Sequence, residues 1–387
     1  RAVERLVTQA AVDTGVDAAE LRRRNFIPPE AFPYKTPTGS TYENADLPGL
    51  LDKALKLGDW QGFAGRRSAS GQAGKLRGIG ISTVIENTGA GLFPKDQIEM
   101  HVAADGTVTA YTVCHSQGQG HETSFAMIIA ETLGIAFDRV RVRQGDEDHP
   151  LIGNHAGGSR STVGAGSACH VTAKKLIEEG KALAALELGV EPSQMAYANG
   201  AFRTAESKRS ITLADLAKAK KFVVTAEGSF SSTFPNGCHI AEVEIDPATG
   251  VTQIASYITV DDCGRVINHA IVEGQMHGGV AQGAGQVFGE EVVYDRATGQ
   301  LLTGSFADYY MPRAGLVGEI SMEEHPTPSK VSPLGVKGMG ESGCTASLPA
   351  LTTAALDALR PLGVQHLDMP LTPSKVWSAI VAAKAGR

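Results

Sequence analysis

A single glutamate stands among the glycines of a stretch near the C-terminal end of the sequence. This residue, Glu341, lies within Gly335–Gly343, and an apolar helix is expected to follow, with Ser347 as its cap and Pro349 in its first turn. Glycines allow a backbone to approach a bound molecule closely and to adopt positive φ angles without strain. The pattern predicts a carboxylate on a tight loop just before a helix N-terminus. A turn glutamate in solvent is the alternative that these residues alone favour.

Three other segments rich in glycine and in amide or hydroxyl side chains each run into a predicted helix. They are residues 117–123, 157–167 and 274–283. Helix N-termini and successive backbone N–H groups attract phosphates, and glutamine offers both donors and an acceptor to a heterocycle. Any one of these segments is more often a sign of tight helix packing. Together with Glu341 they favour a phosphate-bearing cofactor that lies across several loop–helix junctions.

Other kinds of site fit the sequence less well. Gly338–Gly343 matches G-x-G-x-x-G, but no convincing strand precedes it and no acidic residue follows at the end of a next strand, so a nicotinamide site is disfavoured. No P-loop motif is present. His121 and His277 have no histidine or acidic partner at i+4, and a core position is the simpler interpretation of each. A small buried thiol is likewise the simpler interpretation of Cys344.

The composition excludes several classes of protein. With 387 residues, 42% hydrophobic and 20% charged, the chain has the composition of an ordinary globular protein of two or three domains. Its net charge of -7 disfavours nucleic-acid binding, and no apolar run reaches the ~18 residues of a membrane span. The five cysteines are scattered without a C-x-x-C pair, which argues against an iron–sulfur cluster or a metal site in this chain. Such cysteines fit a reducing compartment, and we expect a cytoplasmic protein.

The elements that must position these residues form a pattern that occurs twice. Strands predicted at Gln97–Ala103 and Thr107–Val113 flank an Asp-Gly turn and lead into a helix after His121. Strands predicted at Ala241–Ile245 and Val251–Val260 also flank a turn and lead into a helix that carries the third glycine-rich segment. We therefore predict an α+β fold of two pseudo-repeated lobes, each a mixed β-sheet covered by helices, with a cofactor where the loop–helix junctions converge.

These motifs, in this order and spacing, resemble a known family. The chain is similar to the molybdopterin-binding large subunit of the xanthine oxidase family of molybdenum hydroxylases, and specifically to its C-terminal part. That family includes aldehyde oxidase, xanthine dehydrogenase and aerobic carbon monoxide dehydrogenase large chains. The resemblance spans nearly the whole chain and is carried by these segments: Glu20–Asn25, Thr36–Gly39, Gln117–Thr123, Ser159–Thr162, Glu273–Gln275, Ala281–Gly283 and Lys337–Glu341.

The resemblance implies the cofactor and the residues around it. The cofactor is molybdopterin with molybdenum, in the mononucleotide or the cytosine dinucleotide form, and the pterin dithiolene rather than a protein side chain holds the metal. Glu341 falls on the family's active-site base, which removes a proton from a metal-bound hydroxyl and should be ionised and shielded from water. The positions that fall on cofactor-binding residues are Gln117, Gly118, Gln119, Gly120, His121, Ser159, Arg160, Ser161, Thr162, Gln275 and Gly340.

The resemblance also implies a domain organisation. Residues 1–75 would be the end of a first molybdenum-cofactor-binding domain plus a linker, with the boundary in the polar stretch from Gly58 to Arg77. Residues 76–387 would be the second such domain, with lobes at about 76–235 and 236–387. The chain begins at Arg1 within a predicted helix, and we interpret it as part of a longer polypeptide.

Finally, the resemblance implies an activity and partners. The substrate would be an aldehyde, an N-heterocycle or carbon monoxide, oxidised with water as the oxygen source. Electrons would leave through a 2Fe-2S small subunit and an FAD medium subunit, in a dimer of heterotrimers that also needs the missing N-terminal half of the large subunit. A non-catalytic scaffold or assembly fragment of the same fold is the alternative hypothesis.

Overall fold

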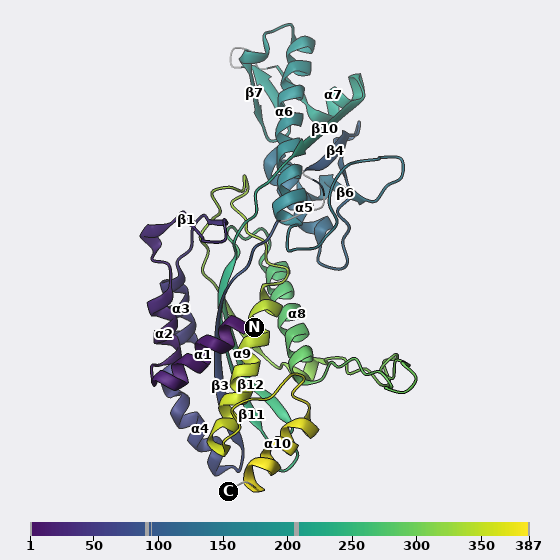
Figure 1. Cartoon of the computed structure of the whole chain (residues 1–387). Helices are drawn as coiled ribbons and strands as arrows, with labels where there is room; N and C mark the ends of the chain where they lie inside the picture. The colour runs from purple at the N-terminus through teal and green to yellow at the C-terminus, as the bar shows by residue number, and fades with distance from the viewer. Residues whose placement is uncertain (1, 90–92, 94, 205–208, 386–387) are drawn as a thin grey trace.

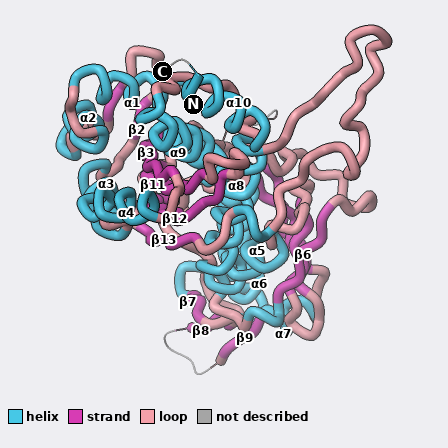
Figure 2. Tube along the Cα trace, turned by 90° about the horizontal axis from the view of Figure 1, so that it is seen from below, coloured by secondary structure: helices cyan, strands magenta, loops and turns pink. Residues whose placement is uncertain are grey.

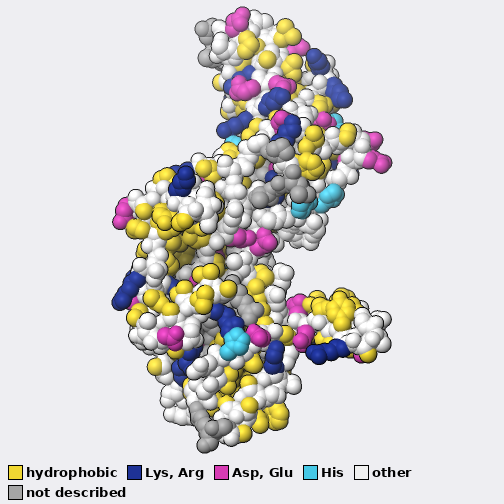
Figure 3. All heavy atoms as spheres, viewed as in Figure 1, with side chains coloured by type: hydrophobic (Ala, Val, Ile, Leu, Met, Phe, Trp, Pro, Cys, Tyr) yellow, Lys and Arg dark blue, Asp and Glu magenta, His cyan; other side chains and the backbone are white. Residues whose placement is uncertain are grey.

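Two lobes stacked end to end make up the molecule (Figure 1). The computed structural model describes residues 2–89, 93, 95–204 and 209–385. Each lobe is built on a four-stranded mixed sheet. The space-filling view in Figure 3 shows a notch between the lobes and, below it, an arm that projects sideways from the larger lobe. This arm contains a hairpin turn at residues 295–299, closed by a bridge between Tyr294 and Leu301.

The larger lobe contains both chain termini and a sheet with the order β13-β12-β11-β3. β11 pairs antiparallel with both β3 and β12, whereas β12 and β13 are parallel. The strands are β3 (Leu76–Ile85), β11 (Asn236–Ile245), β12 (Thr252–Asp262) and β13 (Ile320–Glu324).

Helices cover both faces of this sheet, as Figure 2 shows end-on. On one face α8 and α9 pack side by side, and Gly78 and Gly80 of β3 allow α9 to approach closely: a Cβ at either position would lie 2.1 Å from a carbonyl of that helix. On the other face α3 buries Leu50, Leu51 and Ala54 against Ile240 and Ile258. The helices of this lobe are α1 (Ala2–Thr14), α2 (Ala18–Asn25), α3 (Leu47–Leu57), α4 (Phe63–Gln72), α8 (His269–Phe288), α9 (Ser342–Leu359) and α10 (Pro373–Ala385).

The smaller lobe has a sheet with the order β10-β4-β5-β6. Its strands bury alternate residues such as Ile98 and Met100 against α5 and α6, which is the pattern expected of a sheet covered on one face. The elements are β4 (Asp96–Val102), β5 (Val108–Thr112), α5 (His121–Leu133), β6 (Val140–Gln144), α6 (Ser167–Leu188) and β10 (Phe222–Gly228). This lobe also contains the small sheet β7 (Met195–Ala198), β8 (Ala201–Thr204) and β9 (Ser210–Thr212) and the helix α7 (Leu213–Ala219). A separate two-stranded sheet, β1 (Tyr34–Lys35) and β2 (Thr41–Tyr42), lies beside the N-terminal helices of the larger lobe in Figure 1.

The two lobes repeat one topology. In the smaller lobe the hairpin β4–β5 leads through α5 to β6, which is parallel to β5, and then to α6. In the larger lobe the hairpin β11–β12 leads through α8 to the parallel β13 and then to α9. The predicted α+β class with two related mixed sheets is confirmed.

Three local predictions differ from the structure. The first lobe does not begin at residue 76, because β3 pairs with β11 and so belongs to the sheet of the larger lobe. The stretch 58–77 contains a helix, α4, which packs on β3 instead of forming an open linker. Ser347 is not a cap: α9 already begins at Ser342, and Pro349 lies inside it.

Candidate active site

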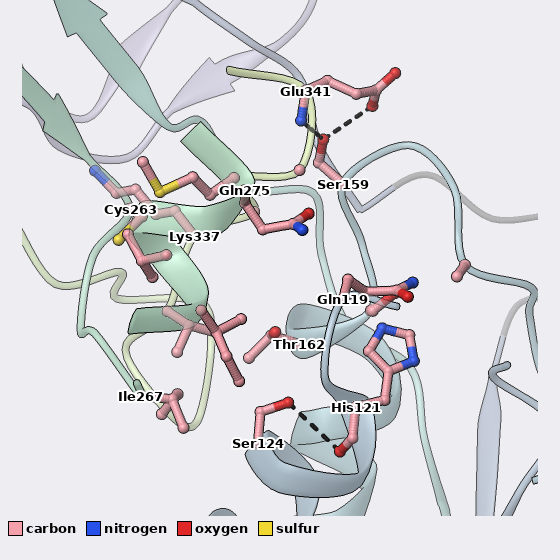
Figure 4. A pocket seen from close by; sticks show the side chains of 18 of the residues that line it. Gln119, His121, Ser124, Ser159, Thr162, Cys263, Ile267, Gln275, Lys337 and Glu341 are labelled. Carbon is pink, nitrogen blue, oxygen red and sulfur yellow. Dashed lines mark hydrogen bonds between the residues drawn. The ribbon is translucent and has the colours of Figure 1, made fainter. Parts of the chain in front are cut away.

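One cavity of about 320 Å³ lies where the two lobes meet and where α5, α6, α8 and α9 begin (Figure 4). All three glycine-rich segments and the Glu341 loop contribute to its wall, so tertiary folding brings together four stretches of chain that are far apart in sequence. The predicted residues that line it are Gln119, His121, Ser159, Ser161, Thr162, Gln275, Gly340 and Glu341.

The first segment turns sharply between β5 and α5. Gly118 and Gly120 have φ angles of 103° and 74°, in the left-handed region that favours glycine. This turn directs Gln119 into the cavity, where its Nε2 donates to Gln117 Oε1 at 2.9 Å. Gln117, Gly118 and Gly120 do not line the cavity themselves; they shape the turn that presents Gln119.

His121, the first residue of α5, is a buried side chain with an unused polar atom. Its ring stacks on Phe125 at 4.9 Å between ring centroids, and only 3% of the residue is exposed. Burial lowers the pKa of His121 below its ordinary value, so the ring is neutral at pH 7. Its Nε2 has no hydrogen-bond partner in the described part of the chain. An unpaired buried nitrogen is costly, and here it belongs to a residue of the cavity wall.

The second segment enters α6 through a π-helical turn at Thr162–Gly166. Ser161 and Thr162 line the cavity at the start of this turn. Arg160 differs from the expectation: its Nη2 lies 2.5 Å from Asp96 Oδ2, and the two side chains are only 6% and 4% exposed. Its guanidinium therefore fastens the loop to β4 and does not reach the cavity.

The third segment supplies Gln275 from the second turn of α8, and Figure 4 shows its amide between the Glu341 loop and Gln119. Gly340 stands close by. A Cβ at Gly340 would lie 3.6 Å from Ser159 Oγ and 3.7 Å from Gln275 Oε1, so both polar side chains border this glycine.

The Glu341 loop is fastened to the second segment by backbone and side-chain contacts. A Cβ at Gly338 would lie 2.0 Å from the carbonyl oxygen of Ser159, so only glycine fits there. The backbone N–H of Glu341 donates to Ser159 Oγ at 3.0 Å, and Ser159 Oγ donates to Glu341 Oε2 at 2.9 Å. Glu341 is solvent-exposed in this chain, so the described residues do not provide the expected shielding from water.

A second carboxylate, Glu86, joins this group, although the sequence analysis did not single it out. Glu86 Oε1 lies 3.2 Å from Ser159 Oγ, and Ser342 Oγ donates to Glu86 Oε2 at 3.3 Å. Burial, and then the charge of Glu341, raise the pKa of Glu86 to about 7. The only sign of Glu86 in the sequence was its position as an acidic residue directly after the apolar run of β3. Nothing in the local sequence indicated that it would lie beside Glu341, 255 positions away.

Cys344 follows within the first turn of α9. Burial raises the pKa of its thiol above the ordinary value, which keeps it protonated and agrees with the interpretation that it is not a nucleophile. All five cysteines are free. No helix in the described ranges combines the length and apolar character that crossing a bilayer would require.

Comparisons of the sequence and of the fold with known proteins identify relatives of this chain. Residues 53–317 match the family model of the molybdopterin cofactor-binding domain. The carbon monoxide dehydrogenase large chain of Hydrogenophaga pseudoflava is 34% identical over 98% of this chain and 50% of its own length. The nicotine 6-hydroxylase large subunit of Paenarthrobacter nicotinovorans is 34% identical over 97% of this chain and 49% of its own length.

A solved structure has the same fold. The crystal structure of Cu,Mo-CO dehydrogenase in its carbon monoxide reduced state superposes with a TM-score of 0.90 at 32% identity, over 99% of this chain and 51% of that chain. The chain thus spans about half the length of the curated relatives and of the solved structure that it matches. The family model, the relatives and the fold show that this chain belongs to the molybdopterin cofactor-binding domain family, as found in the large subunits of molybdenum hydroxylases.

Proposed function

We propose that this chain is the C-terminal, cofactor-binding part of a molybdenum hydroxylase large subunit and that the cavity between its lobes holds molybdopterin. The observation that carries the proposal is the convergence of eight predicted residues from four segments on one cavity. Residues 1–75 would then complete a first cofactor-binding domain, and the remainder would form the second.

The chemistry of the cavity wall suits such a cofactor. Gln119 and Gln275 present amides that both donate and accept, as a pterin with several nitrogens and oxygens requires. His121 adds a buried Nε2 atom that has no hydrogen-bond partner among the residues that the structure describes. Gly157, Gly158 and Gly340 leave space for a ligand beside the backbone, and the segment that enters α6 offers N–H groups to phosphate. We propose that the neighbouring Ser159, Ser161 and Thr162 also bind this phosphate.

Glu341 is the proposed general base. The bound cofactor would supply the two-electron oxidation of the substrate and make the water that provides the oxygen more acidic. Glu341 Oε2 would take up the proton of that water. Its hydrogen bonds with Ser159 hold the carboxylate in one orientation at the cavity wall. The exposed face of Glu341 would be covered by the other half of the large subunit.

The substrate class and the partners follow the relatives. Among proteins similar to this chain, one acts on carbon monoxide and one on nicotine, so an aldehyde, an N-heterocycle or carbon monoxide is the proposed substrate. We propose that the protein works with a 2Fe-2S subunit and an FAD subunit in a dimer of heterotrimers. The cytosine dinucleotide form of the pterin is proposed from the resemblance of the sequence motifs alone.

The test is to purify the protein with its natural partner chains and measure molybdenum and released pterin. Near-stoichiometric amounts of both are expected. Glu341→Gln should keep the molybdenum and lose roughly 10²–10⁴-fold in turnover, the range for a general base. The exposed Glu227→Gln is the matched control and should keep both. An intact complex without molybdenum would instead favour the scaffold hypothesis, and a loss of only a few-fold in Glu341→Gln would exclude the role as base.

A further inference from the structure

Glu86 is held firmly beside Glu341. It follows the last residue of β3, and its backbone N–H donates to the carbonyl of Pro235 at 3.0 Å. Two residues later, Thr88 and Thr233 exchange backbone hydrogen bonds of 2.9 Å in each direction. Backbone hydrogen bonds therefore hold the chain at Glu86 in place. Its half-buried carboxyl faces Ser159, Ser342 and Glu341.

The hydrogen bonds of Ser159 determine where a proton must be. A serine hydroxyl has one hydrogen to donate and can accept two. Ser159 Oγ accepts from the backbone N–H of Glu341 at 3.0 Å and also lies 2.9 Å from Glu341 Oε2 and 3.2 Å from Glu86 Oε1. The single hydroxyl hydrogen serves only one of the two carboxyls. The other contact is a hydrogen bond only if that carboxyl carries a proton and donates it to Ser159.

The environment selects Glu86 as the carboxyl that carries the proton. Glu86 is half-buried, whereas Glu341 is exposed, and burial disfavours the ionised form. Ser342 Oγ donates to Glu86 Oε2, which leaves Glu86 Oε1 as the atom that faces Ser159. Cys344, the other titratable group on this turn of α9, remains a neutral thiol because burial raises its pKa.

We propose that Glu86 is a positioning residue for Glu341: in its protonated form it donates to Ser159 Oγ, so that the Ser159 hydroxyl donates to an ionised Glu341. This inference rests on the proposed role of Glu341 as base. The hydrogen bonds then run in one direction, from Ser342 to Glu86, from Glu86 to Ser159 and from Ser159 to Glu341. The two carboxyls then hold one proton between them, and it resides on Glu86.

The proposal has a consequence for the pH dependence of turnover. The pKa of Glu86 is about 7, and two interacting carboxyls titrate as a pair. Above this pH both carboxyls are charged and compete for one hydroxyl hydrogen, so Glu341 loses its fixed orientation. Turnover should fall on the alkaline side. Glu86→Gln replaces the acid with a neutral amide of the same shape that still donates, so the profile of this variant should lose the alkaline fall.

The direct experiment is infrared titration of the protein in complex with its partner chains, both with and without molybdenum. A C=O band of a protonated carboxyl is expected at pH 6 and should vanish with an apparent pKa near 7. It should be absent in Glu86→Gln and unchanged in the control Glu227→Gln. Glu86→Asp keeps a carboxylic acid and should shift the band, which assigns it independently if Glu86→Gln does not fold.

Two results would overturn the proposal: no protonated carboxyl at pH 6 in the native protein, or parallel pH profiles of turnover in the native protein and Glu86→Gln. The infrared band does not depend on turnover. A shared proton found in a complex whose Glu341→Gln variant remains active would therefore reject the proposed base, and with it the positioning role, while the absence of the band from an active, Glu341-dependent enzyme would reject only the role of Glu86.

Discussion

Lys337 Nζ lies 2.7 Å from Asp262 Oδ2, and the two side chains are 0% and 1% exposed. The same ammonium donates to Thr327 Oγ1 at 2.9 Å and to the backbone carbonyl of Asn44 at 3.1 Å, so all three of its hydrogens have acceptors. Through this one group the Glu341 loop is tied to the end of β12 and to the N-terminal segment. The position of the proposed base thus depends on a buried ion pair in which Lys337 belongs to the cavity wall and Asp262 lies behind it.

Removing one partner of this pair should destabilise the protein strongly. Lys337→Met leaves the Asp262 carboxylate buried without a counter-charge, which costs about 3–5 kcal/mol. The matched control is Lys53→Met, which breaks a half-exposed pair with Glu323 at 2.9 Å and should cost less than about 1 kcal/mol. Chemical unfolding of the purified variants measures both. Equal costs would show that the buried pair has no special role.

Arg160 should act on stability through Asp96 and only secondarily on cofactor content. Arg160→Met and Asp96→Asn each leave one buried charge unpaired, at a cost of about 3–5 kcal/mol. The double variant should cost less than the sum of the two, because neither charge is then left alone. Unfolding of the three variants gives the coupling energy. A stable Arg160→Met protein that has lost its molybdenum would instead support the cofactor contact expected from the sequence.

The two glycines beside Glu341 should respond differently to alanine. At Gly338 a Cβ would lie 2.0 Å from a backbone oxygen, so Gly338→Ala must displace the loop and lower the unfolding temperature. At Gly340 the nearest atom would be 3.6 Å away, an ordinary contact, so Gly340→Ala should fold normally. Its methyl group would occupy the space beside Ser159 and Gln275 and should lower the molybdenum content. Thermal unfolding and elemental analysis separate the two effects, and equal unfolding temperatures would contradict the prediction.

Glu86 should make the stability of the native protein depend on pH. Its pKa is about 7 in the folded protein against the ordinary value of 4.5 for a glutamate, so between these values the folded state binds more protons than the unfolded state. The free energy of unfolding therefore decreases as pH rises from about 4.5 through about 7. Glu86→Gln lacks this loss and should be more stable than the native protein by about 1–2 kcal/mol at pH 8, after allowance for solvent screening of a half-buried group.

Unfolding at pH 5 and at pH 8 measures this difference. At pH 5 the difference in stability between the two proteins should be much smaller than at pH 8. At this pH Glu86 keeps its proton in the folded state, and the pH is only slightly above the ordinary pKa of 4.5. A constant difference between them at both pH values would show that the titration of Glu86 is not responsible.

The sequence by itself determined the elements and the residue types at the site. The strands predicted at Gln97–Ala103 and Thr107–Val113 correspond to β4 and β5, and the Asp105-Gly106 turn joins them as expected. These features depend on local causes: the alternation of buried residues along each strand and the positive φ of Gly106. The glycine-rich motifs likewise carry their own turn chemistry, which is why eight of the predicted site residues do line the cavity.

The tertiary structure alone decided which side chains meet. Arg160 has the sequence context of a cofactor-binding residue, yet its guanidinium pairs with Asp96, 64 positions earlier. Glu86 and Ser342 are 256 positions apart and touch only because β3 crosses into the larger lobe and lies against α9. Turn and helix signals act over a few residues, whereas the partner of a buried charge depends on how distant strands pair. The motifs of the candidate site could therefore be located from the sequence, whereas the partners that fix the charge of their side chains could not.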